Sequence, residues 1–201
     1  TGYLGRALAD RLQRDGHKVR ILDIRSGDLV CEYIEGDILS EVDVDRAVKG
    51  VDGIFHVAAV VGFWKGKRAW QRSVNVDGTR NVMLAALKHN VPRIVYTSTI
   101  NTLGFVATES DIGDENTAYN WGPLDVSYME TKHEAEQLVI GLVRQSALPA
   151  TIVNPGTIFG GMGTIGMNAN RYIELIRARQ MPAYPTGGTN CVALEDVVEG
   201  H

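Results

Sequence analysis

The sequence predicts an α/β fold in which helices flank a doubly wound parallel sheet. Apolar, strand-like segments alternate with amphipathic segments of helical period along the chain, which is the pattern of successive βαβ units. Residues 54–61 form a nearly continuous apolar run, as in a parallel strand covered on both faces. With 201 residues, of which 44% are hydrophobic and 22% charged, the chain can form a globular domain with a sizeable core.

Helix and strand signals follow one another from the N-terminus. The apolar spacing from Leu4 to Leu12 predicts a helix that ends at Gly16. Ser40 is placed to cap a short helix over residues 41–49. The other predicted helices cover residues 72–89, the segment around Tyr128, and residues 170–179. The predicted strands cover residues 18–24, 30–35, 54–61, 91–98 and 150–154.

The first residues have the glycine spacing of a dinucleotide-binding turn. Such a fold has a strand, a G-x-x-G-x-x-G turn or a variant of it, and then a helix. Gly2 and Gly5 fit the second and third glycines, but the first glycine and its strand are absent from the sequence. We therefore expect an internal fragment of a longer protein. It would contain a Rossmann-type NAD(P)-binding domain over residues 1–160 that lacks its first strand, and the start of a substrate-binding part over residues 161–201.

Asp23 ends the first predicted strand, 18 positions after Gly5, near the spacing expected for the acid that binds the adenosine ribose. Its carboxylate would accept a hydrogen bond from the 2′-hydroxyl and repel a 2′-phosphate, which favours NAD. Arg25 leaves NADP open, because a guanidinium group at this place could bind that phosphate. The simpler interpretation of Asp23 is an ordinary polar residue at a strand end.

The helix around Tyr128 contains the strongest candidate for chemistry. Tyr128 and Lys132 are four residues apart and share one helix face, which Ala135, Val139 and Leu142 continue as an inward apolar stripe. An ammonium group close to a phenol lowers the pKa of the phenol from about 10 towards neutral pH. Tyr128 is therefore a candidate general acid/base. A Tyr-x-x-x-Lys pair alone is weak evidence, because short motifs recur by chance.

Composition excludes several other classes of protein. A formal net charge of −4 offers no basic surface for nucleic acid. Cys31 and Cys191 stand outside any CxxC pattern, which argues against a zinc site or a disulfide scaffold and favours a reducing, cytoplasmic location. The histidines do not cluster at ligand spacing, so we expect no metal site. The longest apolar run is too short to span a bilayer, and no signal-like segment is found, so we expect no membrane association.

Eight short motifs in a fixed order resemble the extended short-chain dehydrogenases/reductases, the NAD(P)-dependent epimerase/dehydratase family. The nearest similarity is to its dihydroflavonol-reductase-like and 3β-hydroxysteroid-dehydrogenase-like branch. Together the motifs run along the whole chain, which makes them specific to the family but much less specific to a substrate. They are Thr1–Gly5, Gly36–Ile38, Phe55–Ala59, Asn75–Thr79, Val95–Thr99, the pair Tyr128 and Lys132, Asn154–Gly160, and Glu195–His201.

The resemblance implies a catalytic triad. The family places its catalytic hydroxyl in the Thr97-Ser98-Thr99 run, usually at the last position, so Thr99 is expected and Ser98 is the alternative. This hydroxyl would hydrogen bond the substrate oxygen while Tyr128 transfers the proton. Lys132 would bind the nicotinamide ribose and favour the phenolate. Hydride transfer itself belongs to the cofactor.

The same resemblance implies NAD, or NADP, held by several turns. Backbone N–H groups at the start of the first helix suit a pyrophosphate, and the small Ala58 and Ala59 would let the cofactor approach a strand end. An unliganded turn and ordinary packing are the respective alternatives. The expected cofactor-binding residues are Gly2, Tyr3, Leu4, Gly5, Asp23, Asp37, Ile38, Ala58, Ala59, Thr97, Tyr128, Lys132, Pro155, Gly156 and Thr157.

A small-molecule substrate would lie beyond the carboxyl ends of the strands. The expected walls of its site are residues 60–64, 101–125 and 160–168. Trp64 and Trp121 could stack on a sugar or a flat ring, or could cover the core. The basic cluster of Lys65, Lys67 and Arg68 fits either a solvated loop or a site for the diphosphate of a nucleotide sugar.

Three functions are compatible with the sequence. The first is an NAD(P)-dependent oxidoreductase that acts on a secondary alcohol or ketone. The second is a nucleotide-sugar epimerase or dehydratase with the same triad and a recycled NAD. The third is a non-catalytic NAD(P)-sensing protein, which the intact Tyr128 and Lys132 disfavour. Resemblance to the family further implies a homodimer formed by the helices that contain Asn75 and Tyr128.

Overall fold

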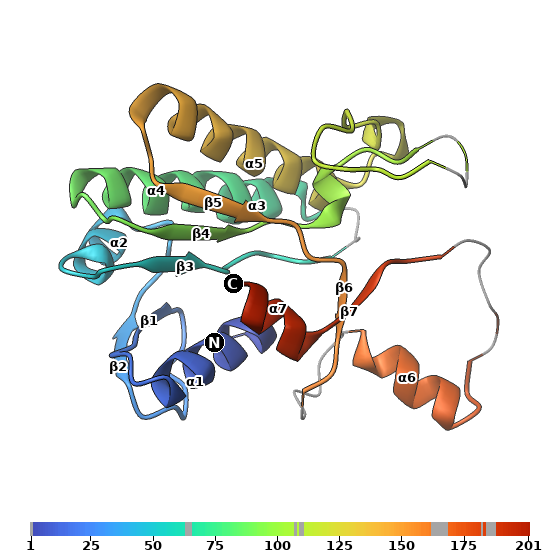
Figure 1. Cartoon of the computed structure of the whole chain (residues 1–201), viewed down its shortest axis with the longest axis horizontal. Helices are drawn as coiled ribbons and strands as arrows, with labels where there is room; N and C mark the ends of the chain where they lie inside the picture. The colour runs from blue at the N-terminus through green and yellow to red at the C-terminus, as the bar shows by residue number, and fades with distance from the viewer. Residues whose placement is uncertain are drawn as a thin grey trace.

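The computed structural model describes residues 2–62, 66–106, 108, 111–161, 169–181, 183 and 188–201. Its strands are β1 (Arg20–Asp23), β2 (Glu32–Glu35), β3 (Ile54–His56), β4 (Ile94–Thr97), β5 (Ala150–Val153), β6 (Thr157–Phe159) and β7 (Cys191–Ala193). They form three parallel groups, β1-β2, β3-β4-β5 and β6-β7 (Figure 1). The parallel pairing confirms the predicted α/β class.

Helices and short turns connect these strands. The α-helices are α1 (Tyr3–Arg14), α2 (Glu41–Val48), α3 (Arg68–Arg72), α4 (Thr79–Lys88), α5 (Ser127–Ser146), α6 (Asn170–Arg177) and α7 (Leu194–Gly200). A π-helical segment, η1 (Ser73–Gly78), joins α3 to α4, and two 3-10 turns are η2 (Ile100–Thr102) and η3 (Gly122–Leu124). Ser40 caps α2 as predicted, because its side chain accepts a hydrogen bond from the Asp43 N–H.

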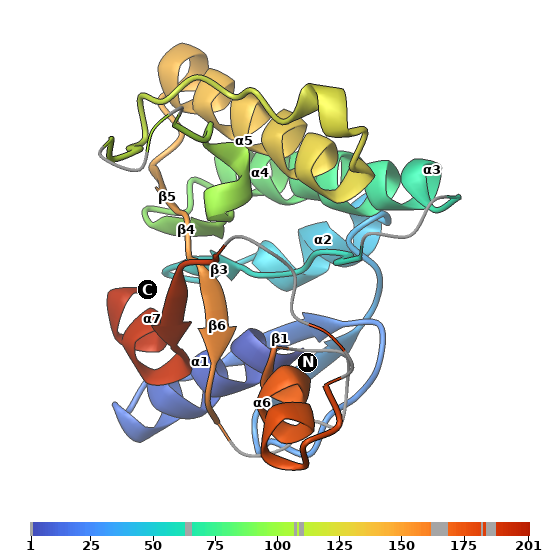
Figure 2. The same cartoon turned by 90° about the vertical axis from the view of Figure 1, so that its right-hand side faces the viewer.

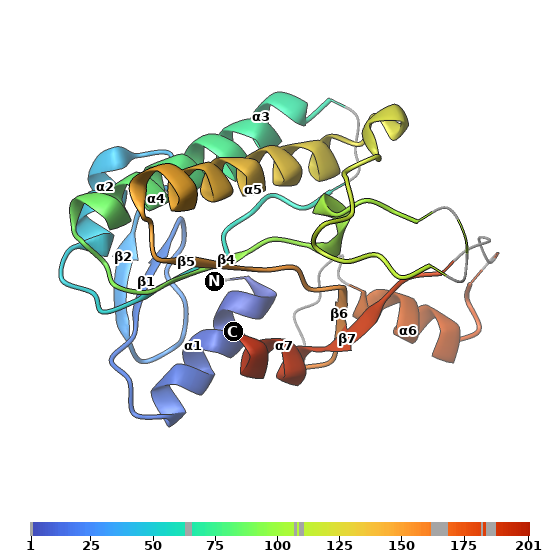
Figure 3. The same ribbon diagram turned by 45° about the horizontal axis from the view of Figure 1, so that its top comes forward.

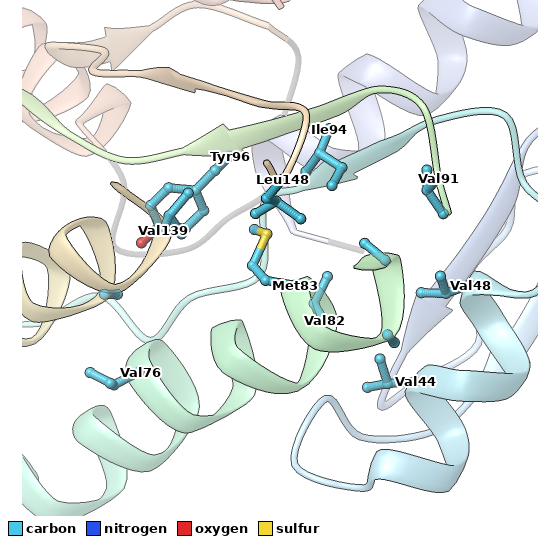
Figure 4. Close-up of a cluster of buried hydrophobic side chains, with 13 residues drawn as sticks. Val44, Val48, Val76, Val82, Met83, Val91, Ile94, Tyr96, Val139 and Leu148 are labelled. Carbon is cyan, nitrogen blue, oxygen red and sulfur yellow. The ribbon is translucent and has the colours of Figure 1, made fainter. Parts of the chain in front are cut away.

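The larger core lies between β4 and the helices α2, α4 and α5. Ile94 and Tyr96 are two positions apart on β4, so both side chains point to this face, where they are buried. Figure 4 shows Tyr96 close to Val139, and Met83 and Leu148 between the strands and α4. Burial of a large apolar side chain contributes about 1.5–3 kcal/mol, so this cluster anchors α5, the helix of the candidate site.

A second core covers the opposite face of the strands. Leu4 and Leu8 of α1 are buried against Leu194 and Val197 of α7, and Phe55 of β3 packs on them. Figures 2 and 3 show α4 and α5 on one side of β3, β4 and β5, and α1 and α7 on the other. Helices therefore cover both faces, as a doubly wound arrangement requires.

Within the described residues, β1 has β2 as its partner and β3 has β4, and no strand joins β1 to β3. A Rossmann-type sheet has its first strand at that place. The described part of the chain thus has the arrangement expected of a fold without that strand.

Three predictions differ most from the structure. The strand predicted for residues 54–61 ends at His56, because Asn75 binds the backbone of Val60 in place of a neighbouring strand. Its Oδ1 accepts from the Val60 N–H at 2.7 Å, and its Nδ2 donates to the Val60 C=O at 3.2 Å. The helix predicted to begin at residue 72 begins at Arg68, so Asn75 lies inside the helix and not at its start.

The third difference concerns the segment after β5, for which no strand was predicted. Thr157–Phe159 form β6, which pairs in parallel with Cys191–Ala193. The partner strand is more than thirty residues away in the chain, so local sequence patterns gave no sign of the pairing.

No helix in the described part of the chain combines the length and apolar composition needed to span a bilayer.

Candidate active site

Tyr128 and Thr99 meet where β4 gives way to η2 and α5 begins. Tyr128 lies in the first turn of α5, with 9% of its surface exposed, and its hydroxyl is hydrogen bonded to the side chain of Thr99. Burial raises the pKa of Tyr128, and the bond to Thr99 partly opposes this. From the sequence we expected the opposite direction, because of a nearby ammonium. In this structure the ammonium of Lys132 is directed to other partners.

Lys132 lies one turn further along α5 and is 2% exposed. Its Nζ donates to the Tyr96 hydroxyl at 2.9 Å and to the Thr97 C=O at 2.8 Å. Burial lowers the pKa of Lys132 to about 7, and the charge of Glu136 opposes that fall. The side chain is therefore poised between its charged and neutral forms near neutral pH.

The structure separates the two candidate hydroxyls. Ser98 is buried, and its Oγ is directed towards Thr102 Oγ1, 3.5 Å away, while its N–H donates to the Val153 C=O. Thr99 contacts Tyr128. Of the two alternatives, Thr99 is thus the one that contacts Tyr128. Its hydroxyl and that of Tyr128 are close enough together to bind the same substrate oxygen.

Sequence reasoning overlooked a buried acid beneath this site. Glu136 is 5% exposed, and its Oε2 accepts hydrogen bonds from Thr102 Oγ1 and Asn154 Nδ2, both at 2.7 Å. It lies one turn after Lys132 on the same helix face. That spacing was the one available signal, because a glutamate on an inward apolar stripe requires partners.

Asn75 bridges two elements beside the site. Besides holding Val60, its Nδ2 donates to Thr131 Oγ1 of α5 at 3.1 Å. A π-helical segment inside a helix often marks a functional site, and here η1 brings Asn75 between the end of β3 and α5. The neighbouring His56 is buried, with Nε2 2.9 Å from Thr79 Oγ1, and burial lowers the pKa of His56 to about 3. A neutral imidazole bonded to a threonine fits a structural role.

The expected phosphate turn begins α1. Gly2 is the N-cap residue, without a side-chain cap, and a Cβ built on Gly2 or Gly5 would meet no atom within 4 Å. Tyr3 and Leu4 have other contacts: the Tyr3 hydroxyl donates to the Gly160 C=O, and Leu4 packs in the second core. If these two residues contact a cofactor, they do so through their backbone. Thr1 lies outside the described residues.

The expected adenosine side lies at the ends of β1 and β2. Asp23 Oδ1 accepts from the Arg25 N–H at 3.2 Å, and Asp37 Oδ1 accepts from the Leu39 N–H at 2.9 Å. Ile38 packs against Gly78 of η1, where a Cβ would lie 2.5 Å from Ile38 Cδ1. At the end of β3, Ala58 is exposed and Ala59 is partly buried. The aspartates are therefore separate from the Thr99 and Tyr128 pair, on the neighbouring group of strands.

The expected nicotinamide side follows β5. The Pro155 C=O accepts from the Ile100 N–H at 3.1 Å, and Thr157 is the first residue of β6. At Gly156 a Cβ would lie 2.4 Å from Asn190 Oδ1 and 2.8 Å from the Asn190 C=O oxygen, so a larger residue does not fit without a shift. Thr97 Oγ1 lies 2.9 Å from Nε2 of His201, the residue after α7.

The expected substrate walls are only partly described. Trp121 Nε1 donates to the Leu103 C=O at 2.7 Å, and its ring lies against Phe105, with centroids 4.8 Å apart. Arg68 forms ion pairs with Asp125 and Glu130. These contacts favour a packing role for Trp121, and they argue against Arg68 as part of a diphosphate site. Trp64, Lys65 and residues 162–168 lie outside the described residues.

Known proteins share this arrangement. The model of the 3-beta hydroxysteroid dehydrogenase/isomerase family matches residues 1–184. A Synechocystis protein provisionally named dihydroflavonol 4-reductase is 34% identical over 208 residues, which cover 100% of this chain and 60% of that relative. The crystal structure of gox2253 has a TM-score of 0.89 and 36% identity, and the match covers 100% of this chain and 62% of that one. This chain thus spans about 60% of the length of either relative.

A more distant structure shares the fold. The UDP-glucose 4-epimerase of Thermus thermophilus, solved in complex with NAD, has a TM-score of 0.82 at 17% identity, and the match covers 100% of this chain and 70% of that one. The order of the sequence motifs, the helices on both faces of the sheet and the family match over residues 1–184 all indicate the same family. The chain belongs to the 3-beta hydroxysteroid dehydrogenase/isomerase family, within the extended short-chain dehydrogenases/reductases.

Proposed function

We propose that this chain carries the cofactor-binding and catalytic part of an NAD(P)-dependent oxidoreductase that interconverts a secondary alcohol and a ketone. The observation that carries the proposal is the hydrogen bond between the buried side chains of Tyr128 and Thr99, one helical turn from Lys132. Two hydroxyls side by side can bind one carbonyl oxygen, and one of them can transfer the proton. The family match gives this pair its context.

The residues at the start of α1 fit a dinucleotide. That helix begins without a side-chain cap and without an acidic residue in its first turn. Gly2 and Gly5 leave open space where other residues would place a Cβ. An uncapped helix N-terminus attracts a pyrophosphate through its N–H groups and its dipole. The bound nicotinamide would supply or accept the hydride.

In this proposal Tyr128 moves the proton. During ketone reduction its hydroxyl gives a proton to the substrate oxygen, and Thr99 donates a hydrogen bond to the same oxygen. The raised pKa of Tyr128 keeps the phenol protonated for that step. Lys132 uses two of its three N–H donors on Tyr96 and Thr97. The remaining donor would bind the nicotinamide ribose, and its charge would stabilise the phenolate.

The test uses the full-length parent protein. Absorbance at 340 nm is followed with NADH and with NADPH against ketones, steroids, flavanonols and nucleotide sugars. We expect oxidation of one cofactor with a ketone, and a loss of about 10²–10⁴-fold in Tyr128→Phe, as is usual for a general acid. Tyr33→Phe is the control, because Tyr33 lies on β2 and is not among the residues proposed to bind cofactor or substrate. Equal rates for wild type and Tyr128→Phe would refute the assignment.

The alternative of a nucleotide-sugar epimerase or dehydratase uses the same three residues and a recycled NAD. It predicts a changed sugar without net oxidation of the cofactor, so product analysis in the same assay separates the two. The ion pairs of Arg68 with Asp125 and Glu130 weaken its case as a diphosphate site. A tightly bound cofactor that does not transfer hydride to any substrate would instead support the NAD(P)-sensing alternative.

NAD is the proposed cofactor, with Asp23 as the ribose ligand at the end of β1. We also propose the division at residue 160, with residues 161–201 beginning the part that binds the substrate. A homodimer through α4 and α5 is the proposed assembly, because Leu84 of α4 is 47% exposed on the outer side of these helices. Light scattering of Leu84→Glu beside wild type tests the assembly: a dimer should dissociate, and an unchanged mass would reject this interface.

A further inference from the structure

Glu136 is the centre of a buried polar network that connects three elements of the site. From η2, Thr102 Oγ1 donates to Glu136 Oε2 at 2.7 Å, and from the end of β5, Asn154 Nδ2 donates to the same oxygen at 2.7 Å. Asn154 Nδ2 also lies 3.2 Å from the Thr99 C=O. Glu136 itself comes from α5, two turns after Tyr128. One carboxylate thus joins the helix of Tyr128 and Lys132 to the turn that presents Thr99.

Hydrogen bonding alone does not require a carboxylate at this position. A glutamine has nearly the same shape, and its carbonyl oxygen could accept from the same two donors. A carboxylate that is 5% exposed is costly unless an opposite charge compensates it. The negative charge therefore needs a separate explanation.

Lys132 supplies the opposite charge. It precedes Glu136 by one helical turn, is itself 2% exposed, and interacts with it electrostatically. The other titratable groups that face the pair are Tyr96 of β4, Tyr128 of α5 and His56 of β3. Burial keeps these three neutral near pH 7, because the pKa values of both tyrosines are raised and that of His56 falls to about 3.

One further imidazole lies at the edge of the network. His133 Nδ1 donates to the Thr102 C=O at 3.2 Å, and its ring stacks on Tyr119 with centroids 4.1 Å apart. It is only partly buried, and its ring nitrogen contacts the Thr102 C=O, whereas Glu136 contacts the Thr102 side chain. Lys132 remains the fully buried cation of the described site.

We propose that Glu136 is a positioning residue that fixes the Thr99 turn against α5 and provides the counter-charge of the Lys132 ammonium. The inference rests on the proposed function for its catalytic consequence, but the charge relationship can be measured without turnover. Loss of the carboxylate leaves a buried ammonium whose remaining contacts are neutral, so Lys132 releases its proton more readily. With a neutral Lys132, the phenolate of Tyr128 loses its stabilising charge.

The test is a pH titration of Lys132 in the full-length, cofactor-free protein, followed by NMR of ¹³Cε-labelled lysine and assigned with Lys132→Met. We expect the midpoint of Lys132 to fall in Glu136→Gln by one pH unit or more, a tenfold change in its protonation equilibrium. The matched control is Glu134→Gln. Glu134 lies on the same helix but is 45% exposed and paired with Arg72, so its loss should leave the midpoint unchanged.

A midpoint that stays at the wild-type value in folded Glu136→Gln overturns the proposal. If that variant does not fold, Glu136→Met replaces it: an apolar side chain of similar length removes the charge, and Thr102 Oγ1 and Asn154 Nδ2, which lose this acceptor, keep the Thr99 C=O as another. The same lower midpoint is then expected, and an unchanged one again overturns the proposal. Failure of both variants to fold would show that Glu136 is required for the fold itself, against a role in positioning alone.

Catalysis provides the second measurement. In Glu136→Gln, the alkaline limb of the pH profile for ketone reduction should move to lower pH, because Lys132 loses its proton earlier. The Glu134→Gln profile should match wild type. If the wild-type protein reduces no ketone, the proposed function fails, while the NMR midpoint still decides the charge relationship. The two failures are therefore distinguishable.

Discussion

The Lys132 ammonium donates a 2.9 Å hydrogen bond to the Tyr96 hydroxyl and lies 4.5 Å from the centroid of the same ring. One aromatic residue of β4 thus receives both a hydrogen bond and a cation–π contact from the helix beside it. Tyr96 itself is fully buried in the larger core. The orientation of the proposed catalytic lysine is therefore fixed by the same packing that stabilises the sheet.

The first prediction concerns stability against pH. The pKa of Lys132 falls from 10.5 to about 7 on burial, so between these values the unfolded chain holds a proton that the folded chain lacks. The free energy of unfolding should then rise with pH across this window, by up to about 1.4 kcal/mol per pH unit from this residue. Lys132→Met should rise less steeply, as measured by urea unfolding at pH 7, 8 and 9.

The control for this series is Lys88→Met, because Lys88 is an exposed lysine paired with Asp45. Its unfolding free energies should run parallel to those of wild type. Parallel curves for Lys132→Met as well would contradict the buried, partly neutral lysine.

A second prediction separates the two hydroxyls after β4. Thr99→Val removes the group that contacts Tyr128, and ketone reduction should fall by at least tenfold in kcat/KM, or about 1.4 kcal/mol. Ser98→Ala removes a hydroxyl that is directed towards Thr102 and away from Tyr128, so its rate should change by less than about threefold. A larger loss in Ser98→Ala than in Thr99→Val would reverse the assignment.

The third prediction concerns cofactor choice. Asp23→Asn removes a negative charge from the proposed ribose site, so the ratio of kcat/KM for NADPH to that for NADH should rise by about tenfold, as expected for one lost charge–charge repulsion. Steady-state kinetics with both cofactors measure it. Asp28→Asn is the control, because Asp28 pairs with Arg6. An unchanged ratio in Asp23→Asn would place the ribose elsewhere.

A fourth prediction concerns Asn75 in the π-helical segment η1. Asn75→Ala removes the bonds to both backbone groups of Val60 and to Thr131. Unsatisfied buried groups cost about 1–3 kcal/mol each, so the free energy of unfolding should fall by at least that amount in urea. Asn116→Ala, in an exposed turn with Asp114, is the control and should cost less. Equal losses of unfolding free energy in the two variants would show that the buried bonds of Asn75 contribute no more to stability than those of an exposed asparagine.

Local patterns predicted most of the fold, because local interactions determine those parts. The cap at Ser40 and the pair Tyr128 and Lys132 depend only on residues within one or two helical turns. The pairing of β6 with β7 depends on segments more than thirty residues apart, and it was not predicted. The early end of β3 depends on Asn75, whose amide group takes the place of a strand.

The site shows the same limit. Glu134 and Glu136 both follow Lys132 within about one turn, and only three-dimensional packing distinguishes the exposed one from the buried one. The predicted direction of the pKa shift of Tyr128 was wrong for a related reason. Spacing placed Lys132 near Tyr128, but it could not reveal that Tyr96 and the Thr97 C=O hold the ammonium.

Gly156 has a consequence for natural variation. Because a single methyl group there would collide with Asn190 from the segment before β7, a missense change at this codon would affect the crossing of β5 into β6 and the neighbouring segment at once. In a saturation library we would expect glycine alone to survive selection at position 156. Gly2 and Gly5 face open space, so alanine at these positions should survive selection for folding but should be eliminated by selection for activity.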